Sequence, residues 1–129
     1  MTRTNCVPVE ELTDKHLLAE YRELPRIFAL AKYVYDAPKQ YVLGTGHMKF
    51  FYDKLEYLVK RQIQLVAELQ KRGVRTTFNG EDLWHFHEKA GGKLPAKLWN
   101  DWVPDERAMA INRARLAERL AGIKYKKIA

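Results

Sequence analysis

Apolar side chains recur every three or four residues in the stretch after Thr13 and Asp14, and either of these two residues can cap a helix. The repeat predicts a helix whose core-facing stripe is formed by Leu17, Tyr21, Leu24, Phe28 and Ala31. Pro25 falls inside this pattern, so we expect the helix to kink there, or to end and restart with Pro25 in its first turn. The sequence Asp-Ala-Pro at 36–38 ends the segment.

A second helix is predicted from about His47 to Arg72, where the helical repeat is strongest. Residues 43–46, which contain two glycines, are expected to form a tight turn that leads into this helix, and Gly73 is expected to end it. Its apolar side is formed by Phe51, Leu55, Leu58, Gln62, Leu65, Val66 and Leu69, and its outer side carries Lys49, Lys60 and Lys71. A core helix with a solvated basic face accounts for this pattern.

Residues 75–104 are interrupted by glycine and proline, with a short helix predicted at 81–89. Asp105 is expected to cap a last helix through about Leu120. Its core-facing positions are Ala108, Ile111 and Leu116, together with either Ala114 or the stem of Arg115. The basic tail from about Gly122 is expected to be loose. Without a convincing strand or repeat, the sequence predicts an all-α fold: one compact domain over 1–129, with about three main helices and irregular connections.

The net charge of +7 comes from 23 Lys and Arg against 16 Asp and Glu, and the excess lies in the last two thirds of the chain. Such a charge suits a polyanionic partner, because each neutralised phosphate releases counterions, but it also keeps many proteins soluble. A lone cysteine cannot form an intrachain disulfide, and no apolar run approaches the roughly 18 residues that span a bilayer. We therefore expect a cytoplasmic protein without a membrane segment, and a monomer, because no exposed heptad pattern is present.

Polar groups converge on one face of the first predicted helix, opposite its apolar stripe. On an ideal helix His16, Arg22, Glu23 and Arg26 fall on that side. An ordinary solvated face with a Glu23–Arg26 pair would explain them. Alternatively, the carboxylate of Glu23 lies between two guanidinium groups that grip flanking phosphates while it stabilises a cation or removes a proton.

Other candidate sites are less specific. No metal site or cofactor is predicted, because the four histidines lack a further ligand at a familiar spacing and one cysteine cannot form a thiolate zinc site. The Gly-Thr-Gly-His sequence at 44–47 is more consistent with a plain turn than with a phosphate site. Cys6 is expected to be a small buried residue. The aromatic residues Trp84, Phe86, Trp99 and Trp102 are expected in the core more than in stacking on bases.

The N-terminal amine is a candidate nucleophile. Thr2 has a small side chain of the kind that permits removal of Met1, which would leave the amine on Thr2. An α-amine with a pKa of about 7.7 to 8.0 is roughly 10 to 15% neutral at pH 7, whereas a lysine is about 0.04% neutral. The terminal amine could therefore support Schiff-base chemistry without a buried lysine. Nearly every protein has such an amine, so the amine alone does not identify an enzyme.

Three blocks of the sequence resemble the pyrimidine-dimer DNA glycosylase and abasic-site lyase family of the phage endonuclease V type. The first contains Met-Thr-Arg at 1–3, Asn5 and AEYRELPR at 19–26. The second is GHMKFFYDKLEYLVKRQIQLVAELQKRG at 46–73, and the weaker third is WVPDERAMAINRARLAERLA at 102–121.

The resemblance implies a metal-free base-excision repair enzyme that acts on duplex DNA. In that family the amine of Thr2 attacks C1′ of the damaged nucleotide, displaces the base and leaves an imine. Glu23 assists this step and the following β-elimination. The resemblance also implies DNA contacts for Arg3, Lys15, His16, Arg22, Arg26, Arg115 and Arg119, extrusion of a base opposite the lesion, and association with the nucleoid through DNA.

The sequence departs from the family pattern at three places near the implied DNA contacts. The chain is shorter between Val34 and Val42, position 15 is Lys where the family has Gln, and the aromatic tail is reduced to Tyr125. The lyase chemistry is thus better supported than the choice of lesion. Two alternatives stay open: an abasic-site lyase or glycosylase for another lesion, and a noncatalytic DNA-binding module.

Overall fold

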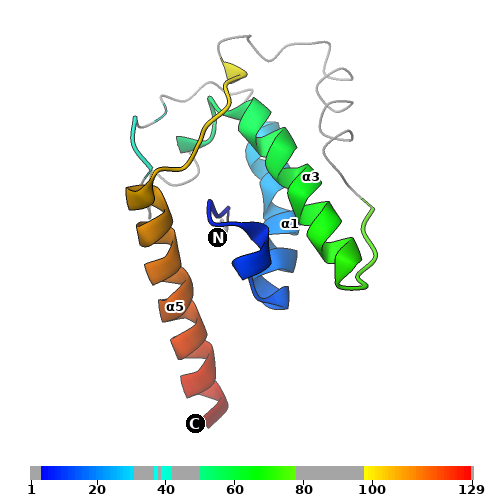
Figure 1. Cartoon of the computed structure of the whole chain (residues 1–129), viewed down its shortest axis with the longest axis vertical. Helices are drawn as coiled ribbons and strands as arrows, with labels where there is room; N and C mark the ends of the chain where they lie inside the picture. Colours follow the sequence, from blue (N-terminus) through cyan, green and yellow to red (C-terminus); the bar gives the residue numbers. More distant parts are fainter. Residues whose placement is uncertain (1–3, 31–36, 38, 42–49, 78–97, 129) are drawn as a thin grey trace.

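The described part of the chain forms three long α-helices and one short 3-10 turn (Figure 1). A computed structural model describes residues 4–30, 37, 39–41, 50–77 and 98–128. The elements are η1 (Val9–Glu11), α1 (Asp14–Leu30), α3 (Leu55–Lys71) and α5 (Glu106–Ile128). Within these residues the only β pairing is an isolated bridge between Lys54 and Trp99. The predicted all-α fold is confirmed, whereas the short helix predicted at 81–89 lies outside the described residues.

Helix α1 begins where the sequence predicts, and Thr13 is the residue that caps it. The Thr13 hydroxyl accepts the backbone N–H of His16 at 3.3 Å, which satisfies one of the free donors of the first turn. The helix runs through Pro25 without ending, so the predicted restart at this residue is wrong. Proline cannot donate to the carbonyl of Tyr21, and Gln62 of α3 donates its side-chain amide to that oxygen at 3.4 Å instead.

Helix α3 begins later than the sequence predicts. Phe51, Tyr52 and Asp53 form a turn, and Lys54 has the non-helical dihedrals φ −127° and ψ 46°. The helix then ends as predicted. Gly73 adopts φ 82°, its N–H bonds to Gln70 O at 3.0 Å, and the next N–H bonds to Leu69 O at 2.9 Å. These two bonds define a Schellman motif, whose left-handed position favours glycine.

Helix α5 is capped by Asp105, as predicted, because its Oδ1 accepts the N–H of Ala108 at 2.7 Å. Of the two alternatives for its stripe, Arg115 is half-buried and Ala114 is exposed. The helix continues to Ile128, so the predicted end near Leu120 is wrong, whereas the looseness of the tail from 122 stays a prediction. A single glycine costs only about 1 kcal/mol in a helix, so Gly122 does not by itself stop it.

The core lies between α1 and α3 and extends under the start of α5. Leu17, Leu24 and Ile27 of α1 are completely buried, as are Leu55, Leu58, Leu65 and Leu69 of α3. A cluster of aromatic rings closes the end of this core and consists of Tyr41, Phe50, Phe51, Tyr57 and Trp102. Trp99 and Trp102 pack against the core, as expected, and Trp84 and Phe86 lie outside the described residues.

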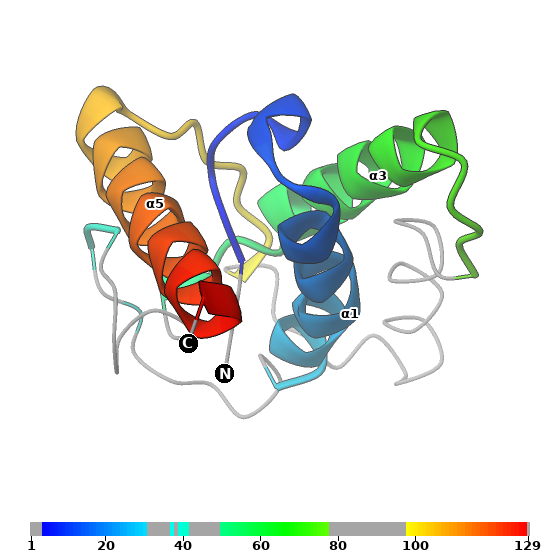
Figure 2. The same ribbon diagram turned by 90° about the horizontal axis from the view of Figure 1, so that it is seen from below.

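Residues 4–8 form an extended segment that lies between α1 and α5 (Figures 1 and 2). The side chains of Thr4, Asn5, Cys6 and Val7 are all buried. A first segment held inside the helices, and not on the surface, is the feature that positions the candidate site. No helix in the described ranges is both long enough and apolar enough to cross a membrane.

Candidate functional site

A buried ion pair joins α1 to α3. Arg61 donates from Nε to Glu20 Oε2 at 2.7 Å and from Nη2 to Oε1 at 3.0 Å. The two side chains are 3% and 0% exposed. Burial by itself lowers the pKa of Arg61, but the charge and hydrogen bonds of Glu20 raise this pKa above its ordinary value. The guanidinium therefore stays charged inside the protein.

This ion pair also holds the N-terminal segment. Arg61 donates from Nη1 to the backbone oxygen of Val7 at 2.7 Å, and the Tyr57 hydroxyl donates to the backbone oxygen of Asn5 at 3.1 Å. The Asn5 side chain donates to Glu20 Oε1 at 2.9 Å. Burial raises the pKa of Tyr57 well above its ordinary value, so the hydroxyl remains a donor.

Helix α5 holds the segment from the other side through one residue. Asn112 Oδ1 accepts the backbone N–H groups of Cys6 at 2.8 Å and Val7 at 3.2 Å. Its Nδ2 donates to Asn5 Oδ1 at 2.8 Å. We call these residues the anchoring network: Asn5, Glu20, Tyr57, Arg61 and Asn112.

Two arginines, Arg61 of α3 and Arg72 at its C-cap, fix the alignment of the N-terminal residues with α1. Arg72 contacts Asp14 at 2.9 Å and the backbone oxygens of Val9 and Glu10. Arg61, about three turns earlier, contacts Glu20 and the Val7 oxygen. Residue numbers therefore fall along the segment as they rise along α1, so the two chain directions are opposite, as Figure 2 shows.

This alignment leads from Asn5 and Glu20 toward Thr2 and Glu23. Glu23 lies three residues beyond Glu20, about 4.5 Å further along the axis of α1 and about 60° around it. Thr2 lies three residues before Asn5, and three extended residues span at most about 11 Å. Although Thr2 and Arg3 are outside the described residues, their attachment point is beside the helix that carries Glu23.

The outer face of α1 carries the predicted polar residues. Glu23 Oε1 lies 3.7 Å from Arg26 Nη1, with side chains 24% and 73% exposed. The predicted i, i+3 pair is confirmed, and such an exposed pair is weak. Arg22 is exposed one residue before Glu23. At the start of the helix Lys15 is exposed and His16 is half-buried.

The two basic residues predicted on the last helix lie one turn apart. Arg115 and Arg119 are both half-buried, and Arg115 Nη1 lies 4.0 Å from Glu118. They follow Asn112 by three and seven residues, so the three side chains share one side of α5. Asn112 thus connects the side of α5 that carries Arg115 and Arg119 to the N-terminal segment.

The sequence analysis missed the anchoring network. Glu20 and Arg61 occupy the same place on their helices, at the edge of the apolar stripe and about 60° from Leu17 and Leu58. Opposite charges at matching positions of two core-facing stripes were the available signal. Nothing in the spacing indicates Asn112, because its partners are more than one hundred residues away.

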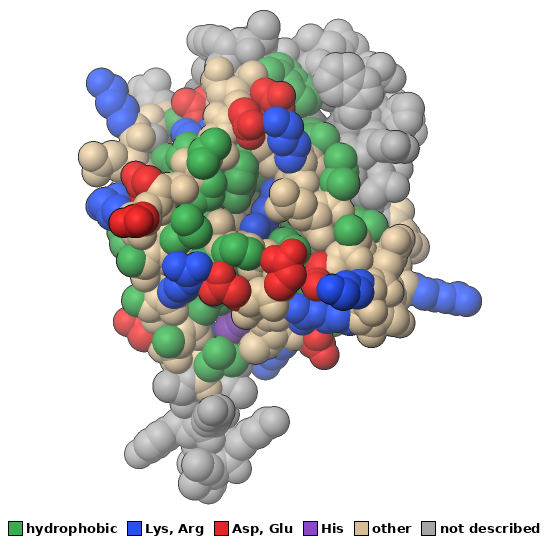
Figure 3. Space-filling model, viewed as in Figure 1, with side chains coloured by type: hydrophobic (Ala, Val, Ile, Leu, Met, Phe, Trp, Pro, Cys, Tyr) green, Lys and Arg blue, Asp and Glu red, His purple; other side chains and the backbone are tan. Residues whose placement is uncertain are grey.

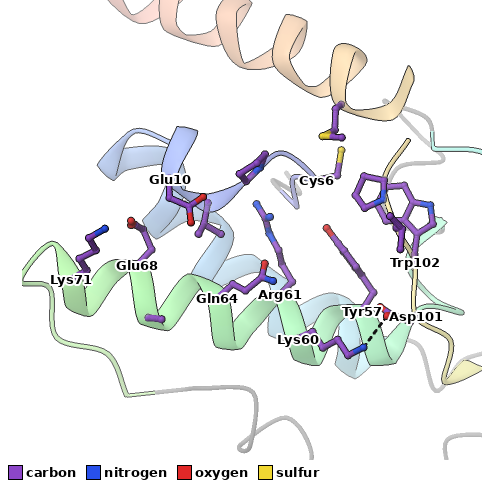
Figure 4. Close-up of a pocket in the computed structure, with 16 residues that line it drawn as sticks. Cys6, Glu10, Tyr57, Lys60, Arg61, Gln64, Glu68, Lys71, Asp101 and Trp102 are labelled. Atoms are coloured by element: carbon purple, nitrogen blue, oxygen red, sulfur yellow. Dashed lines mark hydrogen bonds and ion pairs between the residues drawn. The ribbon is translucent and has the colours of Figure 1, made fainter. Parts of the chain in front are cut away.

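A cavity of about 710 Å³ lies beside the segment, between η1, α3 and residues 101–104. Figure 3 shows the face on which it opens, with acidic and basic side chains around the hollow. In Figure 4, Arg61 points from α3 toward the N-terminal segment. Of that segment the cavity reaches Cys6, but neither Thr4 nor Asn5 lines it. Among the described residues, the cavity is therefore lined by the later part of the segment, Cys6 and Pro8, and by η1.

The remaining predictions concern cysteine and metal chemistry. Burial raises the pKa of the Cys6 thiol from 9.0 to about 12, and the side chain is 5% exposed. Cys6 is thus buried, as predicted, and its raised pKa keeps the thiol protonated. Among the described residues, no group of three or more His, Cys, Asp or Glu side chains could hold a metal ion. The turn at 44–47 and the histidines 47, 85 and 87 lie outside them.

One comparison with known proteins identifies the family. A family model described as pyrimidine dimer DNA glycosylase matches residues 1–82, more than half of the chain. The match includes the N-terminal segment, α1 and α3, and it ends before α5. This chain therefore belongs to the pyrimidine dimer DNA glycosylases, a family of DNA repair enzymes whose substrate is DNA.

Proposed function

We propose that the protein excises pyrimidine dimers from duplex DNA and then cuts the strand as an abasic-site lyase, using the amine of Thr2. The supporting observation is the anchoring network, which holds residues 4–8 against α1, with Asn5 bonded to Glu20 one turn before Glu23. The proposal requires removal of Met1.

In the first step the neutral amine attacks C1′ of the damaged nucleotide. The C1′–N bond breaks, and the base leaves with the bonding electrons. The C1′–O4′ bond then breaks as the nitrogen lone pair forms the C1′=N bond, and the proton lost from the amine passes to O4′, which leaves an imine between the protein and the opened sugar. An α-amine is suited to this role, because it is partly neutral at pH 7 without any tuning.

Glu23 assists both steps through its carboxylate. A negative charge beside C1′ stabilises the positive charge that develops as the base leaves. After the imine forms, removal of a proton from C2′ expels the 3′ phosphate and breaks the strand, and the same carboxylate can accept that proton. Its partial exposure on the outer face of α1 leaves it accessible to DNA.

The basic residues around these groups bind the duplex. Arg22 and Arg26 hold phosphates beside the lesion, because guanidinium groups form paired hydrogen bonds with phosphate oxygens. Arg3, Lys15 and His16 extend this surface from the N-terminus and α1, and Arg115 and Arg119 extend it along α5. Extrusion of a base costs a few kcal/mol, which damaged DNA partly relieves.

Borohydride trapping tests this proposal directly. The protein is reduced on duplexes that carry one cyclobutane dimer, one abasic site or no damage, and the adduct is mapped by mass spectrometry. We expect adducts on both damaged duplexes, attached at the amine of Thr2. Trapping at the abasic site alone would leave a lyase without dimer activity, and an adduct on a lysine would exclude Thr2.

A substitution of the carboxylate tests the second group. Glu23→Gln should retain binding to damaged DNA and abolish cleavage. The matched control is Glu56→Gln, which removes the same charge from a half-exposed residue of α3 and should cleave normally. Cleavage by Glu23→Gln at the wild-type rate would contradict the role of Glu23.

A further inference from the structure

We propose that Asn112 and Asn5 form an amide clamp that positions the N-terminal amine against Glu23 and against the DNA-binding side of α5. This inference rests on the proposed function and concerns α5, which the family match does not cover. Neither residue touches the reacting atoms in this scheme. Both are positioning residues, acting through the segment that they hold.

The Asn5 side chain is the joint of the clamp. Its Oδ1 accepts from Asn112 of α5 at 2.8 Å, and its Nδ2 donates to Glu20 of α1 at 2.9 Å. One amide therefore links the two helices that flank the segment. Because both ends are bonded, a shift of either helix moves Asn5 and the residues before it.

Asn112 directs all its described hydrogen bonds to the N-terminal segment. Its side chain is 2% exposed. Its Oδ1 accepts the backbone N–H groups of Cys6 and Val7, and its Nδ2 donates to Asn5 Oδ1. An apolar residue there would leave buried donors without partners. The segment is extended, so it has no helical bonds of its own to satisfy them.

Satisfying these buried donors stabilises the fold, and the same bonds also fix one geometry of the segment. Buried ionic and polar networks contribute little net stability compared with well-packed apolar residues, but they can specify one geometry. Here we infer that the network fixes the position of the chain end at Thr2, which lies three residues before Asn5. Without the clamp, that end would sample many positions, and few would place an amine within attacking distance.

The clamp also connects catalysis with DNA binding. Asn112 lies one turn before Arg115 and two turns before Arg119 on the same side of α5. Glu20 lies one turn before Glu23 on α1. A duplex bound to Arg115 and Arg119 would therefore be held in a fixed position relative to the amine.

The experiment compares Asn112→Ala with Ile111→Ala in the full-length protein. Ile111 also packs against the core from α5 and has no described bond to the segment, so its substitution controls for destabilisation. Three quantities are measured: the single-turnover rate of imine trapping on abasic duplex, the Kd for that duplex, and hydrogen exchange of the Cys6 and Val7 amides.

We expect Asn112→Ala to lower the trapping rate by about 10- to 100-fold, with Kd within about threefold of wild type, since the residue binds no phosphate. Exchange of the Cys6 and Val7 amides should accelerate, while that of the Leu65 amide in α3 stays slow. Ile111→Ala should trap at nearly the wild-type rate. If Asn112→Ala does not fold, Asn112→Asp serves instead, because it keeps both acceptor bonds and loses the donor to Asn5.

The outcomes separate this inference from the proposed function. Equal trapping rates in wild type and Asn112→Ala would overturn the clamp alone. An equal loss in Asn112→Ala and Ile111→Ala would also overturn it, since the effect would then be structural. No adduct from the wild-type protein would overturn the Thr2 mechanism, and the clamp with it.

Discussion

Cys6 illustrates how burial of a single residue changes the pH dependence of stability. Burial raises its pKa from 9.0 to about 12. Above pH 9.0 the thiol therefore keeps its proton in the folded protein, whereas in the unfolded chain it loses that proton. The resulting contribution to the free energy of unfolding is fully present below pH 9.0 and is lost as the pH rises toward about 12. The loss is at most about 1.4 kcal/mol per pH unit.

We therefore expect the stability of the wild-type protein to fall more steeply between pH 9 and pH 11 than that of Cys6→Ala. Urea unfolding at several pH values in this range measures both slopes. The buried tyrosines Tyr41 and Tyr57 also have raised pKa values, and burial, the largest cause, acts on them in both proteins. Parallel slopes in the two proteins would show that the thiol is not held protonated by the fold.

Arg61 and Glu20 give a second prediction at the scale of residues. Arg61→Met leaves a carboxylate buried without its cation, which should cost about 3–5 kcal/mol in the free energy of unfolding. Adding Glu20→Gln removes that charge while keeping an acceptor for Asn5, so the double variant should regain part of the loss. Chemical denaturation measures both. A double variant less stable than Arg61→Met would contradict this account of the pair.

At the scale of elements, the carbonyl of Tyr21 shows how α1 tolerates Pro25. Gln62 replaces the donor that proline lacks, so the two residues should be energetically coupled. In a double-mutant cycle, Gln62→Met should cost more in the wild type than in Pro25→Ala, where the new N–H can bond to Tyr21. The expected coupling is about 0.5–1 kcal/mol, measured by urea unfolding. Additive effects would mean that the amide contributes nothing at this carbonyl.

The helical repeat predicted α1 and most of α3, because their apolar faces are buried at the expected spacing. It could not predict the turn at 51–53. Phe50, Phe51 and Tyr52 are all buried. Their apolar character is equally consistent with a helix and with a buried turn, so it does not distinguish the two. The break at Lys54 instead accompanies contacts that the local sequence does not contain, such as the bridge to Trp99.

The candidate site was predictable only in part, for the same physical reason. Glu23 and Arg26 are neighbours on one helix, so local spacing indicates their pairing. Glu20 and Arg61 meet only when α1 packs on α3, and Asn112 meets Cys6 only when α5 closes on the N-terminal segment. Contacts between distant segments depend on the fold, and no local period encodes them.

At the scale of the whole molecule, the effect of the net charge of +7 on DNA binding depends on where the charged side chains lie. On the proposed surface Arg26 is largely exposed and only weakly paired. Lys71 is also exposed, but it lines the cavity between η1, α3 and residues 101–104. Removing either side chain's charge changes the net charge equally, so the two substitutions separate local contact from overall attraction.

We expect Arg26→Gln to lower the slope of log Kd against log salt concentration by about 0.9, the value for one lost phosphate contact on duplex DNA. Lys71→Gln should leave this slope nearly unchanged, because Lys71 lines the cavity and is not one of the residues of the proposed DNA surface. Binding to undamaged duplex at several salt concentrations measures both slopes without requiring catalysis. Equal reductions in the two variants would show that DNA responds to the total charge of the protein. A reduction confined to Arg26→Gln would place the duplex against the outer face of α1, within reach of Glu23.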